Sequence, residues 1–189
     1  MLLVSILSLC HAAIIVMGDF KIKKQCGEPF IVSLDHDGIT RESLIYIPTM
    51  LCHDEQLSNL KNQELALQKP LTLPLLVAIH CFGGGPGLRI TNWRSFAEEF
   101  TFILMAPKGV QTSWNGDQCC GYAADQNLDD VGFIQRAINE TINTFSTVFP
   151  SVTLSDGDNG GYLWISGFSN GGFMADKIVC FFLIQDDLC

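Results

Sequence analysis

The stretch that decides the fold is WISGFSNGGFMADKI, residues 164–178. It begins as an apolar run typical of a buried strand and continues, after Ser169, with the residue spacing of a helix. The transition falls on GFSNG, residues 167–171, which fits the pattern G-x-S-x-G. A serine on such a tight turn has strained backbone geometry, and glycine on either side avoids collisions between the strand and the helix. The pattern predicts a nucleophile elbow at Ser169; the alternative is a turn that serves only packing.

A second glycine-rich turn follows an earlier strand candidate. The run Leu75–Ile79 is apolar without alternation, as in a strand covered on both faces, and HCFGGGPG (80–87) comes directly after it. Two backbone N–H groups are candidates to hold a developing oxyanion, those of Asn170 and Phe82. The alternative is a glycine-rich loop without a chemical role. A phosphate cradle is disfavoured, because no Gly-Lys-Ser/Thr follows the glycines.

Strand-like and helix-like segments alternate along the rest of the chain. An Asp37-Gly38 turn is expected to join the first two strands. The expected strands are 30–34, 43–47, 75–79, 102–107 and 162–166, and the expected helices are 92–100, 131–149 and 170–184. This order predicts one α/β domain with a mostly parallel sheet flanked by helices.

Three polar or aromatic residues have competing interpretations. Asp129 and Asp130 come at the start of the clearest helix pattern, where carboxylates cap a helix and interact favourably with its dipole. We expect them to cap the helix and anchor a loop rather than to act as paired catalytic carboxylates. Trp114 could contact substrate at the mouth of a cleft or pack within its own loop.

Whole-chain properties narrow the class of protein. The chain has 189 residues, 48% of them hydrophobic, which suits one domain with a buried sheet. Its formal charge of −9 disfavours nucleic acid and anionic membranes as partners. Residues 1–18 form an apolar run ending among small residues, which predicts a cleaved secretory signal and an extracellular protein. An uncleaved anchor and a buried N-terminal element are the alternatives; residues 19–189 form the domain.

The cysteines also favour an oxidising compartment. They are Cys10, Cys26, Cys52, Cys81, Cys119, Cys120, Cys180 and Cys189. Signal removal would leave an odd number, so that one thiol is free or has its partner outside this chain. We expect Cys119 and Cys120 to form disulfides with separate partners, and we expect no metal, because the spacings do not form a zinc pattern. Asn139 opens an N-glycosylation triplet.

Several motifs together resemble those of a known family. They are GITRESLIYIP (38–48), PLLVAIH (74–80), FILMAPKG (102–109), SWNGDQCCGYA (113–123), DDVGFI (129–134) and GFSNGG (167–172). From about Gly38 to Cys180 the chain resembles the α/β-hydrolases that include polyhydroxybutyrate depolymerases and feruloyl esterases. The resemblance implies a secreted carboxylic ester hydrolase without a cofactor, which acts on a polyester or on feruloylated or acylated polysaccharide. Ser169 is then the nucleophile, with Phe82 and Asn170 as oxyanion donors.

Two departures from that family concern the oxyanion loop and the catalytic base. Cys81 stands where the family usually has glycine. In α/β-hydrolases an acidic residue and then a histidine follow the serine, and in this family both would lie beyond Cys189. The histidines present are His11, His36, His53 and His80. Only His80 is expected near Ser169, as a loop-organising residue or, alternatively, as a substitute base.

The chain is therefore expected to be the N-terminal portion of one α/β-hydrolase domain. Its C-terminal strands would be missing, which would leave the strand at 162–166 on an exposed edge. Without a base the serine hydroxyl is a poor nucleophile, so weak activity or none is expected. The alternative function is a non-catalytic binding or interaction protein that retains the hydrolase cleft.

Overall fold

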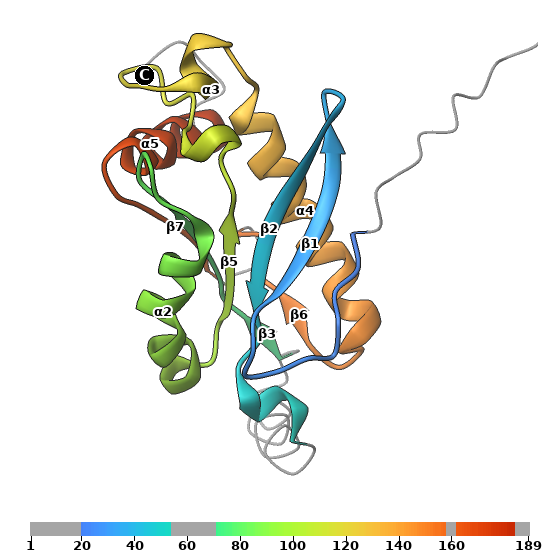
Figure 1. Cartoon of the computed structure of the whole chain (residues 1–189). Coiled ribbons are helices and arrows are strands. Elements are labelled where there is room, and N and C mark those ends of the chain that lie inside the picture. Colours follow the sequence, from blue (N-terminus) through green and yellow to red (C-terminus); the bar gives the residue numbers. More distant parts are fainter. Residues whose placement is uncertain (1–19, 54–70, 158–161, 184–189) are drawn as a thin grey trace, which may run out of the picture.

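The computed structural model describes residues 20–53, 71–157 and 162–183 (Figure 1). The expected leader at 1–18 lies outside the described residues, as do Cys10 and Cys189. Within the described part, no helix is long and apolar enough to cross a membrane.

The chain enters its main sheet through a hairpin. Strand β1 spans Phe30–His36 and β2 spans Ile39–Tyr46, with Asp37 and Gly38 between them at φ angles of 51° and 75°. Left-handed backbone at both central positions gives a type I′ turn, whose twist suits two antiparallel strands. The prediction of a hairpin with an Asp-Gly turn is confirmed, although the observed strands reach closer to the turn.

The main sheet has five strands in the order β1-β2-β5-β4-β7. Strand β4 spans Leu75–Ile79, β5 spans Ile103–Pro107 and β7 spans Leu163–Gly167. Strands β1 and β5 pair antiparallel to β2, whereas β4 pairs parallel to both β5 and β7. All strands except β2 therefore run in one direction, and the domain is mixed α/β with a mostly parallel sheet. Two short strands, β3 (Thr72–Leu73) and β6 (Thr153–Leu154), form a separate parallel pair.

Three long helices cover the two faces of this sheet. They are α2 (Pro86–Phe100), α4 (Asp130–Val148) and α5 (Asn170–Leu183). In β4 the side chain of Ala78 belongs to the cluster that includes residues of α2. The side chain of the adjacent residue Val77, on the opposite face of the sheet, belongs to the larger cluster, which includes residues of α4 and α5. Helices α2 and α4 accordingly lie on opposite sides of the sheet (Figure 1).

Helix α2 begins earlier than the sequence pattern predicts. The pattern places a helix at 92–100, whereas the helix starts at Pro86. Gly85 precedes it with extended backbone, and a proline in the first turn has no N–H to leave unpaired and a φ already suited to a helix. The glycines around Pro86 do not contribute to a periodic pattern of hydrophobic residues, so the first turns of the helix cannot be recognised from that pattern.

Strand β7 lies at the end of the five-strand order and is less covered than its neighbours. Every residue of β4 and β5 is buried, whereas no residue of β7 is fully buried. Trp164 is 40% exposed, and Tyr162, immediately before the strand, is 62% exposed and stacks on Trp164. Within the described part of the chain, the predicted edge position of this strand is observed.

Two cysteine pairs form disulfides among the described residues. Cys26, ahead of β1, bonds to Cys52 at the end of a short 3-10 helix. Cys119 and Cys120 bond to each other, so the expectation that each has a separate partner is wrong. A disulfide between adjacent cysteines was not expected from the sequence, because neighbouring side chains in an extended backbone point to opposite sides. Cys180 is also disulfide-bonded, and Cys81 is the free thiol of the described part.

Candidate active site

Ser169 lies on the turn between β7 and α5. The strand ends at Gly167 and the helix begins at Asn170, so only Phe168 and Ser169 separate them. Ser169 has a φ of 56°, a left-handed conformation that is uncommon for any residue with a side chain. Its carbonyl accepts the Gly172 N–H at 2.7 Å, which starts the helix at once. The predicted strand–serine–helix geometry of an elbow is therefore present, with the serine exposed.

Steric constraints require glycine at positions 167 and 171, on either side of Ser169. A β-carbon on Gly167 would collide with the carbonyl of Gly171, where the helix turns back over the strand. A β-carbon on Gly171 would collide with the carbonyl oxygens of Ile79 and His80, at the end of β4. Both contacts are with backbone, which has little freedom to move away. The sequence prediction that glycines prevent clashes here is confirmed.

The two predicted oxyanion donors lie at the same end of the sheet. Strand β4 pairs with β7 so that Ile79 lies opposite Gly167. Phe82 follows Ile79 by three residues, and Asn170 follows Gly167 by three residues. Among the described residues, neither backbone N–H donates a hydrogen bond. Both residues therefore follow the carboxyl ends of neighbouring parallel strands, at the end of the sheet where Ser169 lies, and Asn170 is 0% exposed.

The side chain of Asn170 has a structural position that sequence reasoning missed. It is fully buried, and its Oδ1 accepts the Trp114 N–H at 2.8 Å. Its Nδ2 donates to the carbonyls of Trp114 and Cys119, both at 2.9 Å. These bonds attach the first residue of α5 to the loop that carries the cysteine pair. Trp114 itself is 0% exposed, belongs to the larger core cluster and lies with its ring 4.9 Å from that of His80, so it neither lines an open cleft mouth nor packs within its own loop alone.

His80 is held from both sides of its ring. The Gly109 N–H donates to Nε2 at 2.9 Å, so Nδ1 carries the proton and donates to the Cys81 carbonyl at 2.8 Å. The residue is 1% exposed, and burial lowers the pKa of His80 below its ordinary value. The indole N–H of Trp114 donates to the His80 carbonyl at 2.9 Å. These contacts organise loops and leave no ring nitrogen free to act as a base.

The other histidines are not placed to serve Ser169. His36 ends β1, where its Nε2 lies 3.0 Å from Asp129 Oδ2, and His53 follows the 3-10 helix at 49–52. His11 lies outside the described residues. Within the described parts, no hydrogen bond joins the Ser169 hydroxyl to another residue. The proton acceptor that an activated serine needs is therefore not found among them.

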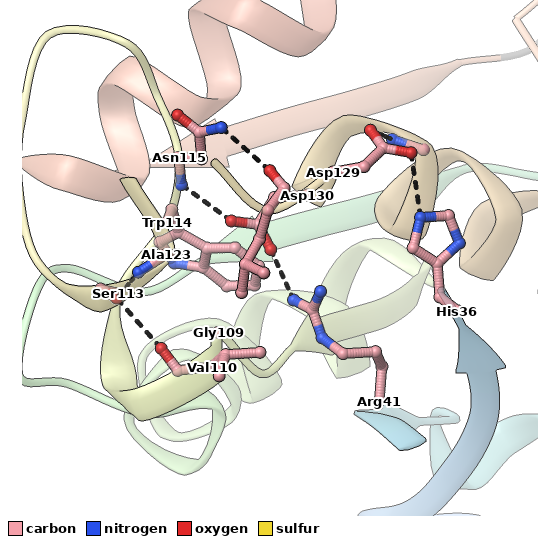
Figure 2. Close-up of polar contacts among 12 residues, drawn as sticks. His36, Arg41, Gly109, Val110, Ser113, Trp114, Asn115, Ala123, Asp129 and Asp130 are labelled. Carbon is pink, nitrogen blue, oxygen red and sulfur yellow. Dashed lines mark hydrogen bonds and ion pairs between the residues drawn. The ribbon is translucent and has the colours of Figure 1, made fainter. Parts of the chain in front are cut away.

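The paired aspartates cap and anchor, as predicted (Figure 2). Asp129 is the N-cap of α4, and its Oδ1 accepts the Gly132 N–H at 2.9 Å. Asp130 is 1% exposed and lies between Arg41 Nη2 at 2.6 Å and the Asn115 N–H at 2.8 Å. A buried carboxylate needs this kind of pairing, because leaving water is costly for a charge. Asp130 thereby links β2, α4 and the loop that begins at Trp114.

One group of side chains in the described part could hold a metal ion. Ligand atoms of His36, Asp37 and Asp129 lie within 4.8 Å of one another. Both aspartates are exposed, and Asp129 already caps α4 and bonds to His36. The helix cap and the hydrogen bond account for the grouping.

The predicted glycosylation residue lies inside a helix. Asn139 is exposed on α4, between Asp130 and Val148. Thr141, the third residue of the triplet, is 0% exposed, and its hydroxyl donates to the Ala137 carbonyl at 2.7 Å. The asparagine is accessible in the folded domain, while the hydroxyl of its triplet is not.

The chain matched no protein-family model, and a search of curated proteins also found no match.

Proposed function

We propose that this chain carries the nucleophile and oxyanion elements of a secreted serine carboxylic-ester hydrolase with an α/β-hydrolase fold. The observation that carries the proposal is Ser169 itself, held at a φ of 56° between two glycines that admit no β-carbon. Such strain persists where the surrounding structure enforces it, and it concentrates at functional sites. The motif resemblance supports a polyester or a feruloylated or acylated polysaccharide as the substrate class.

The proposed chemistry follows from the atoms at the elbow. Ser169 Oγ attacks the ester carbonyl while its proton passes to a base, and the carbonyl oxygen becomes an oxyanion. The N–H groups of Phe82 and Asn170 donate to that oxyanion, which stabilises the tetrahedral intermediate. The base returns the proton to the departing alkoxide, so the alcohol leaves and an acyl-serine remains. Water then attacks the acyl group, which releases the acid and restores Ser169. The two described disulfides support the extracellular setting.

A second function is favoured by the histidine geometry. Both ring nitrogens of His80 are engaged, and no described histidine bonds to Ser169. A site without a base binds an ester or a related carbonyl compound without turning it over. The second candidate is therefore a non-catalytic binding or interaction protein that keeps the hydrolase surface.

The test is covalent labelling of Ser169 combined with ester turnover. A fluorophosphonate probe should label the purified chain at Ser169, and p-nitrophenyl acetate and butyrate should be hydrolysed slowly. Loss of the catalytic histidine costs on the order of 10⁶-fold in rate and leaves catalysis on the order of 10³- to 10⁴-fold above the uncatalysed level. Ser169→Ala should abolish both signals.

Ser95→Ala is the matched control, because Ser95 is exposed on α2, away from the elbow. It should label and turn over like the wild type. A folded wild-type chain that neither labels nor hydrolyses would reject the hydrolase and leave the binding function.

A further inference from the structure

We propose that the carboxamide of Asn170 is a positioning group, which fixes the two oxyanion donors relative to each other. The inference deepens the proposed function and rests on it, because it concerns the same site. It assigns a role to the side chain of Asn170, whereas the proposed chemistry uses only its backbone N–H.

All three hydrogen bonds of the carboxamide go to one loop. With the residue fully buried, Oδ1 accepts from the Trp114 N–H, and Nδ2 donates to two carbonyls, of Trp114 and Cys119. The asparagine carboxamide has one acceptor oxygen and two N–H donors, whereas the aspartate carboxylate, which is similar in size, has acceptors only. The site is therefore matched to asparagine, and aspartate would place a charge against two carbonyl oxygens.

The same loop reaches the other oxyanion donor. A β-carbon on Gly121, one residue beyond the cysteine pair, would collide with the ring of Phe82. The Gly83 N–H donates to the Thr112 carbonyl at 2.9 Å, just before the loop. The loop thus contacts Asn170 through Cys119 and the Phe82 turn through Gly121. It is a direct mechanical link between the residues whose N–H groups would bind the oxyanion.

A second set of contacts between α5 and the same loop distinguishes the positioning role of Asn170 from simple anchoring of the loop. Lys177, two turns further along α5, donates through Nζ to the Asn115 carbonyl at 3.1 Å and to Asp117 Oδ1 at 2.5 Å. Asp130 holds the Asn115 N–H as well. The loop therefore stays attached to α5 and α4 without the Asn170 amide. What the amide alone fixes is the backbone of Trp114 and Cys119 against the residue that follows Ser169.

The strained serine gives the amide a local task. Ser169 has left-handed backbone, and Asn170 is the first residue of the helix that follows it. A strained conformation persists only where neighbouring contacts over-determine it. Because the Asn170 amide holds the start of α5, its removal should relax the elbow as well as the Phe82 turn.

The experiment compares Asn170→Ala and Asn170→Asp with Lys177→Ala, which cuts the other tie between α5 and the same loop. Fluorophosphonate labelling of Ser169 should slow by about 10- to 100-fold in Asn170→Ala, because a small displacement of oxyanion donors has an effect of that size. Lys177→Ala should stay within about 2-fold of wild type, since its bonds lie away from the serine. In Asn170→Asp, labelling relative to wild type should recover as the pH is lowered, because the protonated acid regains one donor.

A readout without chemistry keeps this inference separate from the proposed function. In ¹⁵N–¹H spectra, Asn170→Ala should shift the amide signals of Phe82 and Ser169, whereas Lys177→Ala should leave both in place. Asn170→Ser serves the same purpose if the alanine variant does not fold. If neither the wild type nor any variant is labelled but these amide shifts appear, the positioning role of Asn170 is supported and the proposed hydrolase function is rejected. Equal shifts from both sites, or no shift at Phe82 in the Asn170 variants, would overturn positioning.

Discussion

At Gly171, the α-carbon of one residue approaches the backbone of β4 so closely that no side chain fits. The oxygens it would meet belong to Ile79 and His80, at the end of a fully buried strand. That strand cannot retreat without disturbing the packing on both of its faces. The elbow therefore depends on glycine at this position for its shape, independently of any chemistry at Ser169.

Gly171→Ala is expected to lower the free energy of unfolding by about 1–3 kcal/mol, the usual cost of forcing extra atoms into a packed site. Gly87→Ala is the matched control, because a β-carbon at Gly87 meets nothing within 4 Å in the first turn of α2. Alanine is favoured over glycine there by up to about 1 kcal/mol. Urea unfolding of both variants measures the difference. Equal stabilities for the two would mean that the strand end adapts.

Single residues were predictable where the physics is local. The elbow follows from five adjacent residues and a steric rule, so sequence alone placed Ser169 on its turn, and the capping by Asp129 is similarly local. For the Asn170 amide and the His80 ring the bonding partners could not be identified in this way, although His80 was expected to organise loops. Their partners lie 56 and 29 positions away, at Trp114 and Gly109, and no local signal names them. The pairing of Cys119 with Cys120 was missed although it is local.

At the scale of elements, one carboxylate ties α2 to the end of β2. Glu98 accepts the Tyr46 hydroxyl at 2.6 Å, and its other oxygen accepts the Thr49 hydroxyl at 2.6 Å. Burial alone would raise the pKa of Glu98, but the bonds from Thr49 and Tyr46 outweigh it and hold the pKa below its ordinary value. Burial, together with the bond to Glu98, raises the pKa of Tyr46 to about 12.

The sign of the pH dependence follows from the lowered pKa of Glu98. Its stabilisation is fully present above the ordinary carboxylate value of 4.5 and is lost as the pH falls through the lower value in the folded state. Glu98→Gln should therefore cost about 1–2 kcal/mol near pH 7, the worth of hydrogen bonds to a charged group at a partly exposed site, and progressively less as the pH falls below 4.5. Urea unfolding at pH 7 and at a series of lower pH values tests this. A deficit that stays constant with pH would contradict it.

Long periodic elements were predicted well, and short ones were not. The apolar run of β4 and the three-to-four spacing of α4 gave both elements within about a residue of their observed bounds. Strands β3 and β6 have two residues each, and the helix α3 (Tyr122–Asp125) has four. Segments of that length contain no full hydrophobic period, so they are set by tertiary pairing rather than by local pattern.

At the scale of the whole molecule, the Cys26–Cys52 disulfide closes a chain segment that includes the entire hairpin. The two cysteines are 26 positions apart, for which loop-closure entropy gives about 3–4 kcal/mol of stabilisation. Cys26→Ser with Cys52→Ser should lower the free energy of unfolding by that amount in urea. Cys81→Ser, which removes a free thiol, should change it little. A loss below about 1 kcal/mol would show that the closed segment is already ordered in the unfolded chain.

The α/β class was predictable from the alternation of segments, but the strand order was not. Placing β2 beside β5, and β4 beside β7, requires contacts between residues far apart in the chain. The buried pair of Arg41 and Asp130, separated by 89 positions, is part of the same long-range arrangement. Such pairings depend on how whole faces fit, which a pattern of local periods does not contain.

The buried hydroxyl of Thr141 sets an order of events in time. An enzyme that glycosylates such a triplet recognises the threonine as well as the asparagine. Once α4 has formed, that hydroxyl is bonded to Ala137 and shielded from any enzyme. If Asn139 is glycosylated, the glycan must be attached before α4 forms, so preparations in which the chain folds slowly should carry more of it than those in which it folds fast.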